Sequence, residues 1–314
     1  MCVAICLLIY GLVVSVLVPP LLLWANREGR SPRVGLLAWL GVVGAVLVSW
    51  MGALISVGVD VMGDLLTDRH LDPGRCFSQL HNVASGVYGS AARLGLLVLI
   101  AFGFVSAAVL MWRLAGSLAR ARAVTHDHAR VARIVGRRHE RHDAVVIDHP
   151  EPAAYSVAGN PHTIVLTRAI VAVLDEDHLA AVMAHERAHL SGRHHVLLAI
   201  TRALAAVCPR LDVFVTGAAQ VALLVEMIAD DVAADQHGAS TVREALLALA
   251  EFRPAGPLGA TEVGLLVRVR RLSSPSTTAA TGRLASSLAI GAVLVGPLIA
   301  TIAAASGTAI CLLF

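Results

Sequence analysis

The sequence predicts a multi-span α-helical membrane protein that carries a small, mainly helical polar domain with a short sheet, an α+β arrangement. Two observations support this fold class. Apolar residues make up 57% of the chain and charged residues only 15%, which is more apolar surface than one water-soluble core of this length needs. The apolar residues also gather in long runs, with most of the polar residues between the last two of them. Lipid is therefore expected to be part of the solvent of this chain.

Four apolar runs are long enough for membrane helices, which need about 20 residues to cross the hydrocarbon core. They occupy residues 3–24, 34–59, 91–112 and 284–314. No basic leader or small-residue cleavage site precedes Pro19, so we expect the first run to be retained and not removed as a signal peptide. The predicted parts are a membrane domain with three transmembrane helices (1–112), a polar domain (113–283) and a C-terminal transmembrane helix (284–314).

The arginines predict the orientation of these parts. The chain contains no lysine, and arginines crowd the loop after the first run, the stretch after the third and the stretch before the fourth. The loop between the second and third runs instead carries four aspartates against two arginines. Under the positive-inside rule, we expect a multi-pass protein of the cell membrane with a cytoplasmic polar domain and both termini outside. The arginines form no single groove, so nucleic acid is not an expected partner.

The polar domain should begin with an arginine- and histidine-rich helix and continue with short strands. Runs bounded by proline and glycine predict these strands at 144–147, 155–158 and 163–166. A helix follows, with Asp175 or Asp177 placed to cap its start and Gly192 just past its end. Residues 196–225 are apolar but divided near Pro209, so we favour a helical hairpin packed on the preceding helix or dipping into the bilayer. A pair of true spans is the alternative.

The stretch His185-Glu186-Arg187-Ala188-His189 contains the HExxH pattern. Residues four apart share one face of a helix, so the two imidazoles can bind one metal ion. Glu186 lies beside them, where a carboxylate can take a proton from an activated water and pass it to the leaving amine. A catalytic zinc ion has three protein ligands and one open position, so two histidines require a partner from elsewhere in the chain.

A second acidic pair supplies that partner. Glu226 and Asp230 lie four apart in a helix-compatible segment, so Glu226 is the candidate third ligand and Asp230 the residue that would orient a ligand imidazole. An ordinary helix with acidic residues on its solvated face is the alternative.

The remaining histidines carry weaker signals. His194 and His195 follow the motif helix, and we expect them on a solvated or headgroup-facing surface, as we do the histidines at 126, 128, 139, 142 and 149. His237 is a candidate donor to the developing oxyanion, or simply a polar helix end beside Gly238. The five cysteines are scattered singly and indicate neither a disulfide framework nor a zinc knuckle.

Four segments together resemble the membrane gluzincin peptidases of the HtpX and BlaR/MecR types. They are 164–168, 175–177, 184–190 and 226–230, and the close resemblance covers roughly 155–236. The resemblance implies a zincin domain with Zn²⁺ as cofactor, with His185, His189 and Glu226 as ligands and Glu186 as base.

The same resemblance implies a zinc metalloendopeptidase, a hydrolase that cleaves protein or peptide substrates at the cytoplasmic face of the bilayer. Its substrate could be a transcriptional repressor in a BlaR/MecR-like pathway. The alternatives are HtpX-like quality control of membrane proteins and a catalytically silent membrane adaptor. An extended substrate segment could pair with an edge strand such as 163–166.

Overall fold

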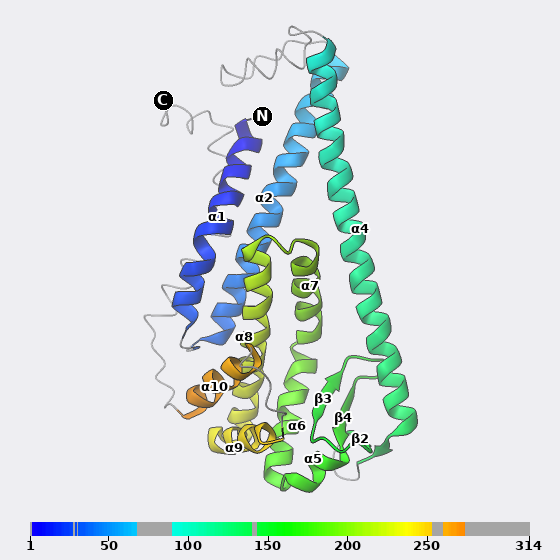
Figure 1. The fold of residues 1–314 in the computed structure, drawn as a ribbon, viewed down its shortest axis with the longest axis vertical. Coiled ribbons are helices and arrows are strands. Elements are labelled where there is room, and N and C mark those ends of the chain that lie inside the picture. Colours follow the sequence, from blue (N-terminus) through cyan, green and yellow to red (C-terminus); the bar gives the residue numbers. More distant parts are fainter. Residues whose placement is uncertain are drawn as a thin grey trace.

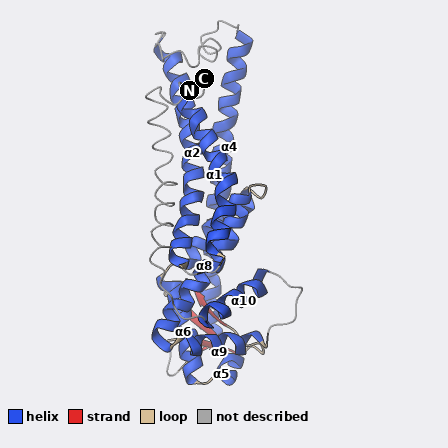
Figure 2. Cartoon of the chain, turned by 90° about the vertical axis from the view of Figure 1, so that its left-hand side faces the viewer, coloured by secondary structure: helices blue, strands red, loops and turns tan. Residues whose placement is uncertain are grey.

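The computed structural model describes residues 2–27, 29, 31–67, 90–139, 143–252 and 260–273. The molecule is elongated, with long helices along its length and a mixed helix and strand region at one end (Figure 1). In Figure 2 the strands lie at the same end as α9 and α10. Mainly helical structure with a small sheet was predicted and is confirmed. The expected transmembrane helix at 284–314 lies outside the described residues.

Three long helices contain the apolar runs of the first third of the chain. They are α1 (Cys2–Asn26), α2 (Pro32–Thr67) and α4 (Ser90–Val135). By length and composition, four segments of the described residues could cross a membrane: Val3–Asn26, Pro32–Val59, Ile100–Val135 and Asp212–His237. No proline interrupts α4, so its apolar half and its arginine- and histidine-rich half form one helix, and the predicted domain boundary at 112/113 falls inside it.

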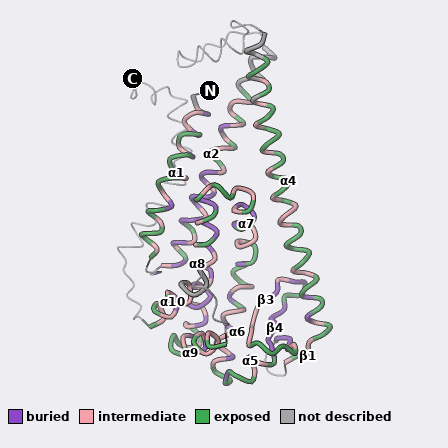
Figure 3. Tube along the Cα trace, in the orientation of Figure 1, coloured by how far each residue is buried: buried purple, intermediate pink, exposed green. Residues whose placement is uncertain are grey.

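The outer faces of these helices are apolar and exposed. Figure 3 shows long exposed stretches on α1 and α4, whereas buried residues gather where α2 meets α8 (Asp212–His237). Trp112, near the middle of α4, is 75% exposed. Contiguous apolar surface of this size on a protein marks contact with a partner or a membrane.

The sheet has four strands in the order β1-β2-β4-β3. They are β1 (Arg137–Arg138), β2 (Val145–Ile147), β3 (Ala154–Val157) and β4 (Thr163–Thr167), and the last three confirm the predicted strands. β2 runs parallel and β3 antiparallel to β4. The expectation that 163–166 forms an edge was wrong, because every residue of β4 is buried between its two neighbours. β3 is an edge strand.

Among the described residues, six helices follow the sheet strands in the sequence. They are α5 (Arg168–Val173), α6 (Glu176–Ser191), α7 (His194–Val207), α8, α9 (Ala239–Ala250) and α10 (Ala260–Ser273). Of these, α5 and α6 pack on the sheet. Of the two predicted caps for α6, Asp175 is the one used, since its Oδ1 accepts from the backbone N–H of His178 at 2.9 Å. Gly192 follows the end of α6, as predicted.

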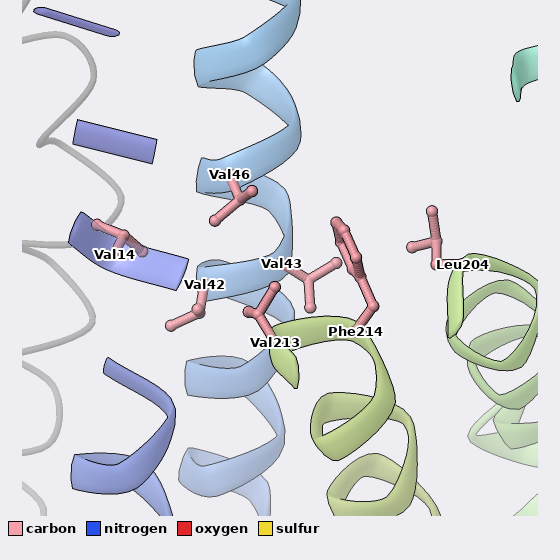
Figure 4. Packing of buried hydrophobic residues seen from close by; sticks show 7 residues of the cluster. All are labelled: Val14, Val42, Val43, Val46, Leu204, Val213 and Phe214. Atoms are coloured by element: carbon pink, nitrogen blue, oxygen red, sulfur yellow. The ribbon is translucent and has the colours of Figure 1, made fainter. Parts of the chain in front are cut away.

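Helices α7 and α8 form the predicted hairpin. Val213 and Phe214, in the first turn of α8, are buried in a cluster with Val14, Val42, Val43, Val46 and Leu204 (Figure 4). This cluster joins the hairpin to α1 and α2. Further along, α8 packs on α6 and continues without a break through Glu226 and Asp230. One helix therefore connects the apolar bundle to the metal-ligand candidates.

Candidate active site

The two motif histidines lie on the face of α6 that meets α8. His185 Nε2 and His189 Nε2 are 3.1 Å apart. Glu226 reaches both from α8, with Oε2 3.4 Å from His185 Nε2 and Oε1 3.5 Å from His189 Nε2. The three residues form a group that could hold a metal ion.

These separations suit a tetrahedral ion. Zinc–nitrogen and zinc–oxygen bonds of about 2.0–2.2 Å in tetrahedral geometry place neighbouring ligand atoms roughly 3.3–3.5 Å apart. His185 Nε2 and His189 Nε2, 3.1 Å apart, are slightly closer than this spacing, and each lies 3.4 or 3.5 Å from one of the two carboxylate oxygens of Glu226. Two imidazoles and one carboxylate are also the ligand types that zinc hydrolases use. The residues present therefore fit zinc, with the fourth position of the tetrahedron left to water or substrate.

His185 is held from behind by Asp230. The His185 Nδ1 atom lies 3.0 Å from Asp230 Oδ1, so the imidazole presents Nε2 to the site. Asp230 is fully buried, which excludes the alternative of a solvated acidic face at this position. A carboxylate behind a ligand histidine sets its tautomer and raises its basicity.

Arg268 of α10 completes this network and was missed from the sequence. It makes a bidentate pair with Asp230, in which Nε and Nη2 each donate at 2.7 Å, and its Nη1 lies 3.0 Å from Glu226 Oε2. The sequence suggested only that Arg268 belongs to a basic stretch before the last apolar run. No local spacing connects it to a partner 38 residues away. Only the folding of α10 onto α8 brings them together.

Glu186 faces the cavity beside β3. Burial raises the pKa of its carboxyl, while the charge of His185 and hydrogen bonds from Ser156 of β3 act in the opposite direction. A raised carboxyl pKa moves a general base closer to the pH at which proton transfer in both directions is efficient.

The two candidate ligand histidines differ in basicity. Burial alone would lower the pKa of His185, but hydrogen bonds to Asp230 and Glu226 outweigh it and raise the pKa to about 9. Burial lowers the pKa of His189 to about 4, because its one acidic neighbour, Glu226, compensates less. In the metal-free protein at neutral pH, one imidazole of the pair is therefore protonated and the other neutral.

The structure corrects the expectation for His194, which was placed on a solvated surface. His194 is 4% exposed, and its Nδ1 lies 3.0 Å from Nδ1 of His189. Burial lowers the pKa of its imidazole. Its sequence position, five residues after His189 and past a glycine, gave no indication of this contact because a helix break separates the two. His195 is exposed, as expected, and lines the rim of the cavity.

His237 lies apart from this group. It is the last residue of α8, two turns beyond Asp230, and is not among the described residues that line the cavity.

His128 contacts Tyr155 through Nε2 and the phenol oxygen at 3.0 Å, at the junction of α4 and β3.

A cavity of about 380 Å³ opens onto the metal-ligand candidates. The described residues that line it come largely from β3, from α6 and from the apolar residues of α9, namely Val242, Ala245, Leu246 and Leu249. The cavity thus combines a strand edge, a set of metal-binding groups and an apolar recess. Metal-binding groups beside a carboxylate in such a cavity are typical of a metallohydrolase.

Comparison with known proteins agrees with this class. Residues 118–253 match the model of peptidase family M48, and this confirms the resemblance inferred from the motifs. Members of this family are zinc metallopeptidases. No solved structure matches the chain.

Proposed function

We propose that this protein is a zinc-dependent endopeptidase of the cell membrane that cleaves protein substrates at the cytoplasmic face. The observation that carries the proposal is the arrangement of His185, His189 and Glu226, whose ligand atoms all lie within 4.8 Å of one another, close enough to bind one ion. The match to a metallopeptidase family over 118–253 supports the same reading.

The roles of the residues follow from their positions. His185, His189 and Glu226 would hold zinc, and Asp230 would keep His185 in the tautomer that presents Nε2. Bound zinc supplies Lewis-acid activation of the attacking water and the scissile carbonyl. Glu186, one residue from the first ligand, accepts the proton of that water and then delivers it to the leaving amine. No covalent bond between enzyme and substrate is needed.

The substrate would bind as an extended segment along β3. In the part of the chain that the structure describes, β3 is the last strand of the sheet, contacts α6 and supplies Ser156 beside Glu186. Backbone pairing with an edge strand is independent of substrate sequence and places the scissile bond over the base. We therefore assign the pairing with an extended substrate segment to Ala154–Val157 and not to 163–166.

The membrane part of the proposal places α1, α2 and the apolar half of α4 across the bilayer. The α1–α2 connection lies near the domain, because Arg271 of α10 donates to the carbonyl oxygen of Gly29 at 2.8 Å. The arginine-rich lower half of α4 packs on the same domain through Ala129 and Ala132. Both basic regions are therefore on the side of the domain, in agreement with a cytoplasmic active site under the positive-inside rule.

The test compares wild type with Glu186→Gln, which keeps the size of the side chain but removes the proton acceptor. Zinc content should be unchanged at about one ion per chain, whereas cleavage should fall by at least about 10²- to 10⁴-fold, the usual contribution of a general base. His189→Ala is the matched control, because it should lose zinc as well as activity. Equal cleavage by wild type and Glu186→Gln would exclude the proposed mechanism.

The same pair of proteins distinguishes the biological roles in cells. Glu186→Gln should retain its substrate, so proteins enriched with it identify what is cleaved. A soluble repressor would support regulated cleavage, and a range of damaged membrane proteins would support quality control. If the fragments and phenotype of wild type and Glu186→Gln are identical, the adaptor alternative replaces both.

A further inference from the structure

We propose that His194 is a positioning residue that holds His189 in the tautomer and orientation needed to bind the metal. This inference rests on the proposed zinc site. It concerns a residue that lies outside the HExxH pattern and on a different helix, the first residue of α7.

The contact between the two rings is specific. Nδ1 of His194 lies 3.0 Å from Nδ1 of His189, and the rings meet edge to face with centroids 4.9 Å apart. Nε2 of His189 points the other way, toward His185 and Glu226. The Nδ1 atoms of both candidate ligands are thus occupied from behind, that of His185 by Asp230 and that of His189 by His194.

The backbone between α6 and α7 is shaped to make this contact. Arg193 has φ 50° and ψ 35°, a left-handed conformation that is uncommon for a residue with a side chain. It reverses the chain so that His194 folds back over the end of α6. Gly192 leaves the space for the ring, since a Cβ atom there would lie 2.4 Å from His194 Nε2.

The chemistry assigns the protons. A histidine that binds zinc through Nε2 carries its proton on Nδ1. Nδ1–H of His189 must therefore donate, and Nδ1 of His194 must accept with its own proton on Nε2. His189 has a neutral imidazole as its acceptor, whereas His185 has a carboxylate. The ligand pair is consequently asymmetric, with His185 the more basic donor to the ion.

The test replaces the acceptor and measures zinc affinity by competition with a chelator. His194→Leu removes the acceptor, and zinc affinity should fall by about 10- to 100-fold, as is usual when a partner behind a ligand is lost. His194→Asn places its carbonyl oxygen where Nδ1 was, so it should retain affinity much closer to wild type. His195→Leu, the exposed neighbour, is the control and should leave zinc affinity unchanged. Thermal unfolding of the zinc-free variants checks that each is folded.

Gly192→Ala tests the contact between His194 and His189 in a second way, by filling the space that the His194 ring occupies beside residue 192. In the wild-type background it should weaken zinc binding because the new methyl group displaces the ring of His194. In a His194→Leu background it should add much less, since the ring it displaces is already gone, and such non-additivity identifies a shared contact.

Two results would overturn the inference: zinc binding by His194→Leu as tight as by wild type, or equal weakening in His194→Leu and His194→Asn. A wild-type protein that binds no zinc would instead remove the proposed function and, with it, this inference. The two failures are therefore distinguishable.

Discussion

At the scale of single residues, the two candidate ligand histidines differ in the group that contacts the Nδ1 atom of each imidazole. His185 and His189 are both in the HExxH pattern, yet hydrogen bonds raise the pKa of one and burial lowers the pKa of the other. The HExxH pattern predicts the same ligand role for both histidines and gives no difference between them. Their neighbours, Asp230 and His194, make them different.

The first prediction concerns the pH dependence of stability in the zinc-free protein. His185 has a folded pKa of about 9 against an ordinary 6.5, so its stabilisation is complete below pH 6.5 and is lost as pH rises to 9. His189 has a folded pKa of about 4, so the unfolded chain takes up the proton first as pH falls below 6.5. The free energy of unfolding therefore decreases between pH 6.5 and pH 4. The thermal midpoint of the chelator-treated protein should therefore be highest near pH 6.5 and decline on both sides.

His185→Gln provides the control for this profile. It removes the group that titrates on the alkaline side, so the decline between pH 6.5 and 9 should become shallower while the acidic decline remains. A wild-type midpoint that does not change between pH 6.5 and 9 would contradict the raised pKa.

At the scale of elements, α8 has two functions in one helix. Its first turns pack Val213 and Phe214 against α1 and α2, and its later turns carry Glu226 and Asp230 into the site. Helix α10 then holds the same region from the other side, through Arg268 on Asp230 and Arg271 on Asp231. The metal-ligand candidates are therefore fixed between the bundle and α10.

The second prediction concerns the buried ion pair between α10 and α8. Among the described residues, Arg268→Leu leaves Asp230, which is fully buried, with His185 as its remaining partner. Removing one member of a buried pair typically costs about 3–5 kcal/mol, so the thermal midpoint of the zinc-free variant should fall clearly. Adding Asp230→Asn should restore part of the loss because no buried charge then remains unpaired.

A matched control is available on the surface. Arg243 and Glu244 form an exposed pair at 3.3 Å, and Arg243→Leu should change stability by no more than about 1 kcal/mol. If Arg268→Leu is no more destabilised than Arg243→Leu, Arg268 does not have the structural role assigned to it.

At the scale of the whole molecule, direct contacts and one unbroken helix connect the apolar helices to the domain that carries the site. Arg271 joins α10 to the α1–α2 connection at Gly29, and α4 runs without a break from its exposed apolar half to the sheet. If α1, α2 and the apolar half of α4 cross the bilayer as proposed, the active site lies close to the bilayer surface. This arrangement suits substrates that are themselves presented at a membrane.

The third prediction tests the orientation in intact cells. In a background with the native cysteines replaced by serine, a cysteine at position 137 should resist a membrane-impermeant thiol reagent, and one at position 68 should react. Labelling both after permeabilisation controls for reactivity. The reverse pattern would place the active site outside the cell and exclude cytoplasmic substrates.

The sequence by itself determined the features that depend on local pattern. Helical spacing brought His185 and His189 to one face, the Glu226 and Asp230 pair appeared at the same spacing, and apolar length marked the long helices. Short runs bounded by proline and glycine located three strands, and Gly192 marked the end of α6, while Asp175 and Asp177 both remained candidates for the cap at its start. These signals are readable because each is imposed by the geometry of a single element.

Tertiary structure alone decided which strand is an edge and which distant groups support the ligands. β4 is central and β3 is at the edge because β3 folds back antiparallel on it, which no strand sequence specifies. His194 reaches His189 through the left-handed turn at Arg193, and Arg268 reaches Asp230 across 38 residues. The edge strand, the His194–His189 contact and the Arg268–Asp230 pair have one physical reason in common. Each depends on how the chain reverses and packs between elements, which local sequence spacing does not specify. For the two polar contacts, burial adds the requirement that each group has a hydrogen-bond partner within the fold.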